Sequence, residues 1–358
     1  MSAEKIFRGR LVMAPMTRGT DLPFRRLAVE WGAEVCVGEM AYAHKVVGRE
    51  TSDLPLLRRH PSEKIFGVQL AGKDPVTMAE AARVAEGMGA DFVDINLGCP
   101  IDEATRRGFG AALLRRASKV AAIVSSMKSA VSIPVTVKLR LGWSSAKPTF
   151  LKIARAAEEA GVDAVVLHPR SRAQRYRKPA DWFAIKQLAE ELSVPVIGNG
   201  DILTWQEAAE RMAASGCAGV MVGRWALAKP WIFREFAERR DLSFGPEQRL
   251  EVVKQYVELC RDHFRDDAKG RARTSRFLTF HQDFFRRYRR GARGESVNSD
   301  DPRDWGEEPE NELEAWLCRA DLPATHALCR WLVDGENPQP PPVVEPGAPR
   351  AVKLVSFG

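Results

Sequence analysis

The stretch Asp91-Phe92-Val93-Asp94-Ile95-Asn96-Leu97-Gly98-Cys99-Pro100 shows the unit from which the predicted fold is built. The apolar run at 92–96 predicts a short buried strand, and Gly98 and Pro100 end that strand abruptly. The thiol of Cys99 then stands on the loop that follows the strand. A lone cysteine is more often a small buried apolar side chain than a catalyst, so the rest of the sequence must decide between these interpretations.

The same unit recurs from residue 8 to about residue 238, as a short apolar run, a turn and a helical stretch. The apolar runs predict eight strands, at residues 11–16, 35–40, 65–70, 92–96, 135–139, 164–168, 194–198 and 219–222. Helices are predicted between them, for instance at 75–88, 111–129, 151–160, 181–191 and 206–214. Eight strands that alternate with helices favour an α/β fold of the (β/α)8 TIM-barrel type over an open doubly wound sheet.

A smaller all-helical domain is predicted after the barrel. Residues 241–246 form a composition break, and amphipathic patterns follow at 247–263, 271–290 and 312–333. We therefore predict a barrel domain (1–240), a helical domain (247–335) and a Pro-rich tail (336–358) that we expect to be disordered. The helix at 271–290 is rich in Arg and aromatic residues, which is usually the mark of an aromatic core face with a solvated basic face.

The composition of the 358 residues limits the class of protein. Lys and Arg number 54 and Asp and Glu 47, so the formal net charge of +7 is consistent with a polyanionic partner, although a solvated basic face gives the same balance. The six cysteines contain no Cys-x-x-Cys pair, no signal-peptide pattern is present at the start, and no apolar run approaches the ~20 residues that span a bilayer. We expect reduced thiols, no metal site, no membrane segment, and a location in the cytoplasm, with the nucleus as a further compartment.

Polar side chains follow the predicted strands, where the functional residues of such barrels lie. These strand ends carry Ala14, Pro15, Met16, Glu39, Met40, Gln69, Asn96, Cys99, Lys138, Arg140, His168, Arg170, Asn199, Gly200, Asp201, Gly223 and Arg224. The stability of a barrel does not require a ring of amides, cations and an imidazole at one rim, so these residues as a set indicate a functional site. Each residue alone has a simpler explanation: Lys138 could form a rim salt bridge, and His168 could be a hydrogen-bonded core histidine.

The ends of the last two strands predict a phosphate site. Gly198-Asn-Gly-Asp201 follows the seventh strand, and Gly223-Arg224 follows the eighth, directly before a short predicted helix. Loops at these two positions, together with a helix N-terminus, commonly bind phosphate in TIM barrels. A lone Gly-Asn-Gly-Asp is more often a tight turn, but two such loops at matching positions favour a phosphate-bearing cofactor or substrate.

As a set, these motifs resemble those of the tRNA-dihydrouridine synthases. The resemblance runs from about residue 10 to residue 290 and is carried by Met13-Ala-Pro-Met16, Val68-Gln-Leu-Ala-Gly72, Asp94-Ile-Asn-Leu-Gly-Cys-Pro100, Gly108-Phe-Gly-Ala-Ala-Leu-Leu114, Val137-Lys-Leu-Arg140, Leu167-His-Pro-Arg170, Gly198-Asn-Gly-Asp-Ile202 and Gly223-Arg224. The sequence looks most similar to the eukaryotic branch that acts on uridine 47 of the tRNA variable loop, through 99–102, 170–176, 180–182 and 229–231.

The resemblance implies a barrel with a C-terminal helical domain, FMN as cofactor, NADPH as reductant and tRNA as substrate and partner, in a monomer. It implies that Cys99 is the general acid, and that the flavin is contacted by Ala14, Pro15, Met16, Gln69, Lys138, His168, Asn199, Gly200, Asp201, Gly223 and Arg224. It places uridine and RNA contacts at Asn96, Arg140 and Arg170, to which we add the basic residues Arg106, Arg107, Arg286 and Arg287. Trp225 replaces a glycine usual in that branch, which leaves the detail of the phosphate loop open.

The implied reaction passes a hydride to C6 of a uracil and a proton to C5 from the opposite face. A thiol with the ordinary pKa of about 8.5 is mostly protonated at neutral pH, as a general acid must be. Two alternatives stay open. One is an FMN barrel that reduces a free pyrimidine or enone, against which the basic helical domain argues. The other is a catalytically silent RNA-binding protein, against which an intact Cys99 and Lys138 argue.

Overall fold

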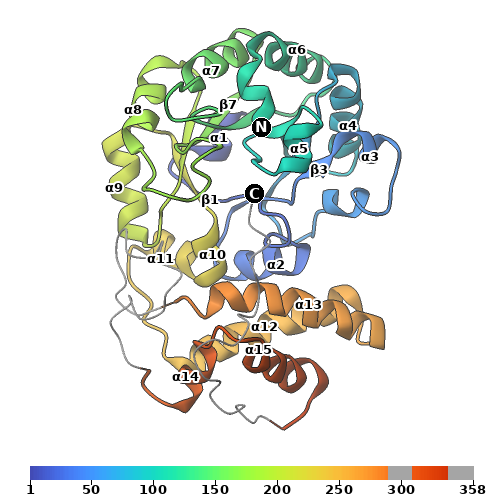
Figure 1. Cartoon of the computed structure of the whole chain (residues 1–358), viewed down its shortest axis with the longest axis vertical. Helices are drawn as coiled ribbons and strands as arrows, with labels where there is room; N and C mark the ends of the chain where they lie inside the picture. Colours follow the sequence, from blue (N-terminus) through green and yellow to red (C-terminus); the bar gives the residue numbers. More distant parts are fainter. Residues whose placement is uncertain (289–308, 338–358) are drawn as a thin grey trace.

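The computed structural model describes residues 1–288 and 309–337. The end of the predicted helix 271–290 and the tail from residue 338 therefore lie outside the described residues. Within those limits the chain forms a barrel with a layer of helices packed against one side (Figure 1).

Parallel strands close into a barrel, which confirms the predicted (β/α)8 fold (Figure 1). In the described part of the chain its eight strands are β1 (Leu11–Met13), β2 (Val35–Val37), β4 (Ile65–Ala71), β5 (Phe92–Leu97), β6 (Val135–Arg140), β7 (Ala164–His168), β8 (Val196–Asn199) and β9 (Gly219–Val222). The barrel closes because β1 pairs with both β2 and β9, and β2 pairs with β4. The two-residue strand β3 (Ala41–Tyr42) was not predicted; it continues the line of β2 along β4.

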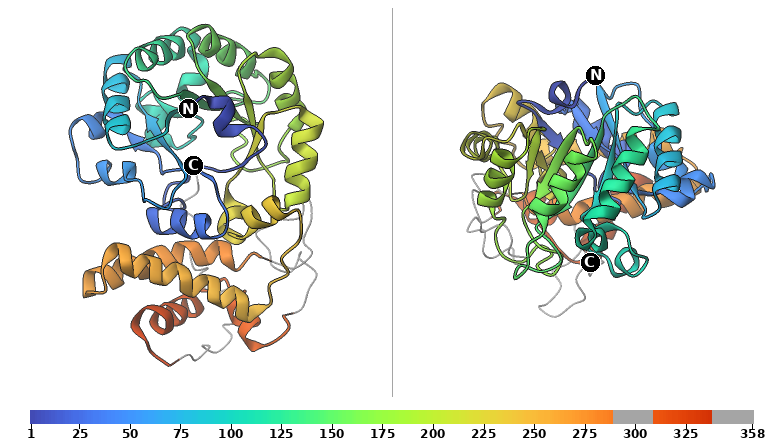
Figure 2. Two further views of the ribbon diagram at one scale, coloured as in Figure 1. Left: turned by 180° about the vertical axis from the view of Figure 1, so that it is seen from behind. Right: turned by 90° about the horizontal axis from the view of Figure 1, so that it is seen from above.

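The strands are buried on both faces, which explains why they appear in the sequence as continuous apolar runs. Every residue of β4 and β5 is buried. The amino-terminal end of the barrel is closed by the helix α1 (Ala3–Phe7), visible from behind in Figure 2. Phe7 packs edge-on against Phe92, with ring centroids 5.2 Å apart. The opposite, carboxyl-terminal end of the barrel is left to form the cavity.

Helices and helical turns surround the barrel. They are α2 (Leu22–Glu30), α3 (Ala43–Val47), η1 (Leu54–Leu57), α4 (Pro75–Gly87), α5 (Asp102–Arg106), η2 (Gly110–Arg115), α6 (Ala117–Lys128), α7 (Phe150–Glu159), α8 (Trp182–Glu191), α9 (Trp205–Ser215), α10 (Arg224–Ala228) and α11 (Ile232–Glu238). The single helix predicted at 111–129 is divided between η2 and α6, because Arg116 leaves the helical region with φ −139° and ψ 71°.

The C-terminal layer consists of α12 (Pro246–Phe264), α13 (Ala268–Phe285), α14 (Glu312–Leu317), α15 (Leu322–Cys329) and the π-type turn η5 (Arg330–Asp334). It lies beneath α2 and α10 in the view of Figure 1. The helix predicted at 312–333 is wrong as one element. Asp321 caps a new helix, and Pro323 sits in its first turn, where the missing N–H costs nothing.

A buried polar contact attaches this layer to the barrel. Asp21 caps α2 by accepting from the N–H of Phe24, and its other oxygen lies 3.0 Å from Nε2 of His281 and 3.1 Å from the hydroxyl of Tyr256. The His281 ring also stacks on Phe24 with centroids 4.5 Å apart. One carboxylate therefore joins the start of a barrel helix to both long helices of the C-terminal layer.

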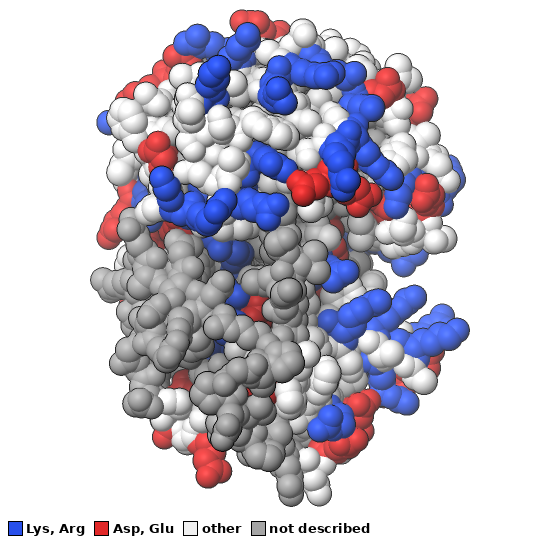
Figure 3. Space-filling model, in the orientation of Figure 1, with Lys and Arg blue, Asp and Glu red and all other residues white. Residues whose placement is uncertain are grey.

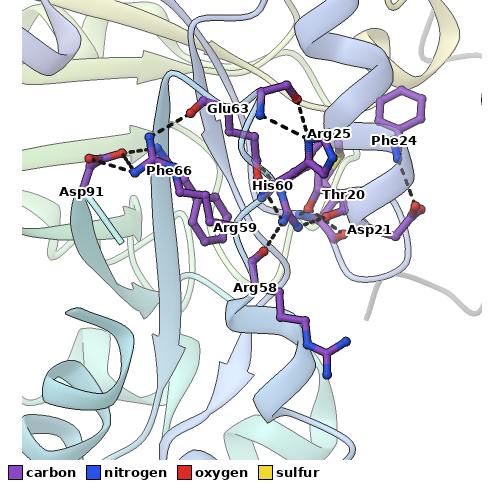
Figure 4. A network of polar contacts seen from close by, with 12 residues as sticks. Thr20, Asp21, Phe24, Arg25, Arg58, Arg59, His60, Glu63, Phe66 and Asp91 are labelled. Carbon is purple, nitrogen blue, oxygen red and sulfur yellow. Dashed lines mark hydrogen bonds and ion pairs between the residues drawn. The ribbon is translucent and has the colours of Figure 1, made fainter. Parts of the chain in front are cut away.

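A buried ion pair holds α2 to the segment that leads into β4 (Figure 4). Nε of Arg25 lies 2.7 Å from Glu63, and both side chains are almost fully buried. Beside it, Arg59 pairs with Asp91 at the start of β5. No helix in the described part of the chain is long and apolar enough to span a membrane, and the described residues contain no cluster of potential metal ligands.

Candidate active site

A cavity of about 310 Å³ opens at the carboxyl-terminal ends of the strands. Every residue predicted to contact the cofactor lines it: Ala14, Pro15, Met16, Gln69, Lys138, His168, Asn199, Gly200, Asp201, Gly223 and Arg224. Cys99, Asn96, Arg140 and Arg170 line the same cavity. The structure therefore brings together residues that are up to about two hundred positions apart in the sequence. Phe280 of α13 also reaches this cavity, so the helical layer forms part of its wall.

Backbone contacts on both sides hold the loop that carries Cys99. The N–H of Cys99 donates to Oδ1 of Asn96 at 2.8 Å, and its carbonyl accepts from the N–H of Ala111 at 3.0 Å. Gly110 makes the second contact possible, because its φ is 61° and a Cβ there would lie only 2.8 Å from the Cys99 carbonyl oxygen. The half-buried thiol thus has a fixed place at the cavity wall.

Burial raises the pKa of the Cys99 thiol above its ordinary value, although Arg140 acts in the opposite direction. The guanidinium of Arg140 is itself held in place, because its Nε donates to the carbonyl of Gly98 at 2.8 Å. A raised pKa keeps the sulfur protonated at neutral pH. Cys99 therefore suits proton donation better than nucleophilic attack.

Lys138, at the end of β6, points across the cavity to the end of β8. Its Nζ donates to Oδ1 of Asn199 at 2.9 Å, and Nδ2 of Asn199 donates to the carbonyl of Met221 at 2.8 Å. Within the described residues no carboxylate lies at ion-pair distance from Lys138. Lys138 therefore does not form the rim salt bridge that the sequence also allowed. Burial, with a smaller effect of Arg140, lowers the pKa of Lys138 to about 8, against the opposing influence of Asp94.

His168 is a neutral imidazole beside the cations of the site. Burial and the nearby cations, Arg140 first among them, lower its pKa well below the usual value. Arg170 lies 3.3 Å from Nε2 of His168. Because a guanidinium can only donate, that nitrogen must be the acceptor.

Arg170 is fully buried beneath the cavity. It pairs with Oδ2 of Asp201 at 2.6 Å and donates to the carbonyl of Lys178 at 2.7 Å. It therefore orders the loops after β7 and β8, and its predicted contact with RNA stays a prediction. Tyr176 was not predicted as a site residue, yet its ring lies 4.2 Å from the Arg224 guanidinium carbon and 5.9 Å from the His168 ring. In the sequence, Tyr176 was marked only as a member of the run 170–176.

The remaining predicted RNA contacts lie outside the cavity. Arg106, the last residue of α5, and Arg107, its C-cap, are both exposed in the segment that follows Cys99. Arg286 and Arg287 instead both pair with Asp283 and are only 11% and 13% exposed.

The exposed basic residues of α13 are different ones. Lys269, Arg273 and Arg276 are all exposed, and their spacing places them along one side of the helix. Figure 3 shows Lys and Arg side chains gathered over α5 and over the amino-terminal half of α13 on one face of the molecule.

The donors and acceptors around the cavity fit a flavin mononucleotide. Asp201 Oδ1 is buried with no hydrogen-bond partner among the described residues, and could accept from a ribityl hydroxyl. Arg224, 3.7 Å from that oxygen, offers a cation for a phosphate, and Lys138 offers one for the ring. Gly200 adopts a φ of 132°, and a Cβ there would lie 2.9 Å from Ala180, so only glycine suits this loop. Trp225 lines the same cavity, so the side chain that replaces the glycine lies at the cofactor-binding loops.

Comparison with known proteins agrees with this geometry. The model of the dihydrouridine synthase (Dus) family matches residues 12–296. A tRNA-dihydrouridine(47) synthase [NAD(P)(+)]-like protein of Rattus norvegicus is 41% identical over 282 residues, covering 78% of this chain and 44% of that protein. A tRNA-dihydrouridine(47) synthase [NAD(P)(+)] of Cryptococcus neoformans is 42% identical over 297 residues, covering 78% of this chain and 41% of that protein.

A solved structure shares the fold alone. The 6-hydroxypseudooxynicotine amine oxidase of Pseudomonas geniculata is 14% identical with a TM-score of 0.50, covering 69% of this chain and 50% of that one. The chain spans less than half the length of the curated relatives that it matches. The family match begins within β1, covers the other barrel strands and includes all of α12 and α13. The chain belongs to the dihydrouridine synthase family.

Proposed function

We propose that this chain carries the FMN-dependent catalytic activity of a tRNA-dihydrouridine synthase. It would reduce the C5–C6 double bond of a uridine in tRNA, at position 47 of the variable loop, with NADPH as the source of hydride. The observation that carries this proposal is the position of Cys99. Its protonated thiol lines the same cavity as Lys138, Asn199 and the loops that follow β8 and β9.

When bound, FMN supplies the hydride chemistry between NADPH and the pyrimidine ring. Lys138 would stabilise negative charge at the ring, since it lies near the end of β6 inside the cavity and has no carboxylate at ion-pair distance within the described residues. Gly223 and Arg224 follow β9 at the start of α10, where the backbone N–H groups of the first turn and the guanidinium would suit the phosphate. Asp201 would accept a hydrogen bond from the polyol chain through Oδ1, which has no hydrogen-bond partner within the described residues.

Cys99 holds the proton that the uracil C5 needs once C6 has received hydride. Because burial raises the thiol pKa, the protonated form predominates at neutral pH. His168, whose pKa is lowered by burial and by the surrounding cations, serves as a neutral hydrogen-bonding group rather than as a source of protons. Each of these roles uses a protonation state that the structure favours at pH 7.

The substrate must present a uridine turned out of the RNA fold, which costs a few kcal/mol of unstacking. Contacts between phosphates and exposed cations can offset this cost. Arg106 and Arg107 at the end of α5, and Lys269, Arg273 and Arg276 on α13, are available for them. All six cysteines are unpaired, which supports the cytoplasmic or nuclear location expected from the sequence. The proposal includes a monomeric enzyme.

The direct test supplies the purified protein with FMN, NADPH and a tRNA transcript that carries no modified bases. We expect dihydrouridine at position 47, read by mass spectrometry of nuclease fragments. Uridine and uracil as free compounds are the matched controls, and we expect no reduction of them. A protein that reduces the free pyrimidine and leaves the transcript unchanged would overturn the proposal.

A further inference from the structure

Asn96 links strand β5 to the loop of Cys99. Its side-chain oxygen accepts from the N–H groups of Gly98 at 3.1 Å and Cys99 at 2.8 Å. With the oxygen used in this way, the NH₂ group must face the opposite direction, and it donates to Oε1 of Gln69 at 2.7 Å. The orientation of the Asn96 amide therefore depends on the orientation of the Gln69 amide.

Gln69 in turn depends on a buried carboxylate. Its Nε2 donates to Oδ2 of Asp94 at 2.8 Å, while Oδ1 of Asp94 accepts from the hydroxyl of Thr136 at 2.6 Å. Gln69 and Asp94 are directly paired in the registers of β4 and β5, and Asp94 and Thr136 in those of β5 and β6. The three side chains are 1%, 3% and 0% exposed. Thr136, Asp94, Gln69 and Asn96 thus form one buried row of hydrogen-bonded side chains.

An amide side chain can present either its oxygen or its NH₂ to a neighbour, whereas an ionised carboxylate can only accept. Asp94 therefore forces the NH₂ of Gln69 to face it, which leaves the Gln69 oxygen for Asn96 and the Asn96 oxygen for the loop. Burial raises the pKa of Asp94 to about 6, with Thr136, Gln69 and Lys138 acting against burial, so the carboxylate is still the main form above neutral pH.

We propose that Asp94 and Thr136 are positioning residues for Cys99: through Gln69 and Asn96, they fix the direction of two amides and thereby the backbone that carries the thiol. The catalytic consequence of this inference rests on the proposed function. The geometric consequence does not, because the fixed element is a pair of backbone N–H groups whose exchange can be measured without any substrate.

The test is hydrogen–deuterium exchange of the Gly98 and Cys99 amides, measured by mass spectrometry with and without FMN. Asp94→Asn keeps the size of the side chain, but its amide can face Gln69 in either direction, so the row loses its fixed polarity. We expect exchange of these two amides to become about fivefold faster, as loss of one hydrogen bond allows. Thr136→Val should act in the same direction by a smaller factor, since Asp94 then keeps only its bond from Gln69.

Asp91→Asn is the matched control. Asp91 lies three residues before Asp94, directly before β5, and accepts from the N–H of Phe66 at 2.8 Å. It has no contact with the row, so exchange at Cys99 should stay at the wild-type rate. A folded Asp94→Asn protein with wild-type exchange at both amides would overturn the inference. If that variant does not fold, unchanged exchange in Thr136→Val overturns it.

Activity gives the second, separable readout. At saturating FMN we expect the rate of dihydrouridine formation to fall about tenfold in Asp94→Asn. Thr136→Val keeps the charge of Asp94 beside Lys138, so the rate should fall by a smaller factor while FMN content stays within about twofold of wild type. If the wild-type protein makes no dihydrouridine, the proposed function is wrong. The positioning role of Asp94 and Thr136 is then tested by amide exchange alone. An active wild type with equal activity and exchange in the variants would reject the positioning role alone.

Discussion

The Nζ atom of Lys138 lies 2.9 Å from the Oδ1 atom of Asn199, so that a cation at the end of β6 is tied to an amide at the end of β8. Both residues line the cavity, and the amide holds the cation toward it. Burial lowers the pKa of this lysine to about 8, which brings its titration close to physiological pH. The charge at the centre of the site is therefore sensitive to pH.

We predict that the affinity of the cofactor-free protein for FMN falls above pH 8. A lysine is charged below its pKa, so the cation of Lys138 is present at pH 7 and is lost as the pH rises through about 8. If only the charged form binds well, affinity should fall toward tenfold per pH unit beyond that point. Fluorescence titrations with FMN from pH 7 to 9.5 measure this. Lys138→Arg keeps its charge and should give a flat profile; equal wild-type affinity at both ends of the range would contradict the prediction.

Lys138→Met should not destabilise the protein at pH 7. The folded-state pKa is lower than that of a free lysine, so the unfolded chain binds more protons between about pH 8 and pH 10.4. The contribution of Lys138 to stability therefore rises with pH through this window, and below it the buried charge is unfavourable. Urea unfolding at pH 7 should give a midpoint equal to or above that of wild type. A clear fall would show that Lys138 supports the fold.

Binding of tRNA should depend on the exposed basic residues of α13. Replacing Arg273 and Arg276 together with Ala removes two exposed cations without disturbing a described ion pair. We expect weaker binding and a salt dependence whose slope falls by about 1 for each lost phosphate contact. Filter binding at several salt concentrations measures both.

The matched comparison is the pair Arg286→Ala and Arg287→Ala. These side chains pair with Asp283, so their loss should lower the stability of the end of α13 more than it changes the slope. If the salt dependence of tRNA binding changes when Arg286 and Arg287 are replaced but not when Arg273 and Arg276 are replaced, then Arg286 and Arg287 contact the RNA instead.

Asp21→Ala should strongly destabilise the protein. The change removes the cap of α2, which is worth about 1 kcal/mol, and leaves the buried groups of His281 and Tyr256 without their acceptor, at about 1–3 kcal/mol each. We expect the free energy of unfolding to fall by about 3 kcal/mol or more in urea titrations. Asp74→Ala, an exposed cap of α4 with no such second contact, is the control and should cost about 1 kcal/mol. Equal losses in the two variants would contradict a role for Asp21 at the junction.

The sequence predicted the barrel because each strand is an apolar run buried on both faces. It predicted the strand-end residues because parallel strands bring their carboxyl ends to one rim. It did not predict β3, whose two residues are too short for a pattern, or the break at Arg116, which lacks a strong turn signal.

The parts of the site that sequence reasoning missed depend on contacts between distant segments. Thr136 and Asp94 meet only through strand register, and Phe280 reaches the cavity only because α13 packs beside α10. No local sequence pattern predicts the contact between Thr136 and Asp94 or the position of Phe280 at the cavity. Arg286 and Arg287 are a different case: Asp283 precedes them by three and four residues on the same helix, so the sequence spacing already allowed these ion pairs and the prediction overlooked them.

The most direct test of the central claim is Cys99→Ala, measured in both half-reactions. The account predicts that the variant binds FMN and oxidises NADPH with the wild-type rate of flavin reduction, while dihydrouridine in tRNA falls at least a hundredfold, as expected for loss of a general acid. Wild-type yields of dihydrouridine from Cys99→Ala would contradict the claim that this thiol supplies the proton.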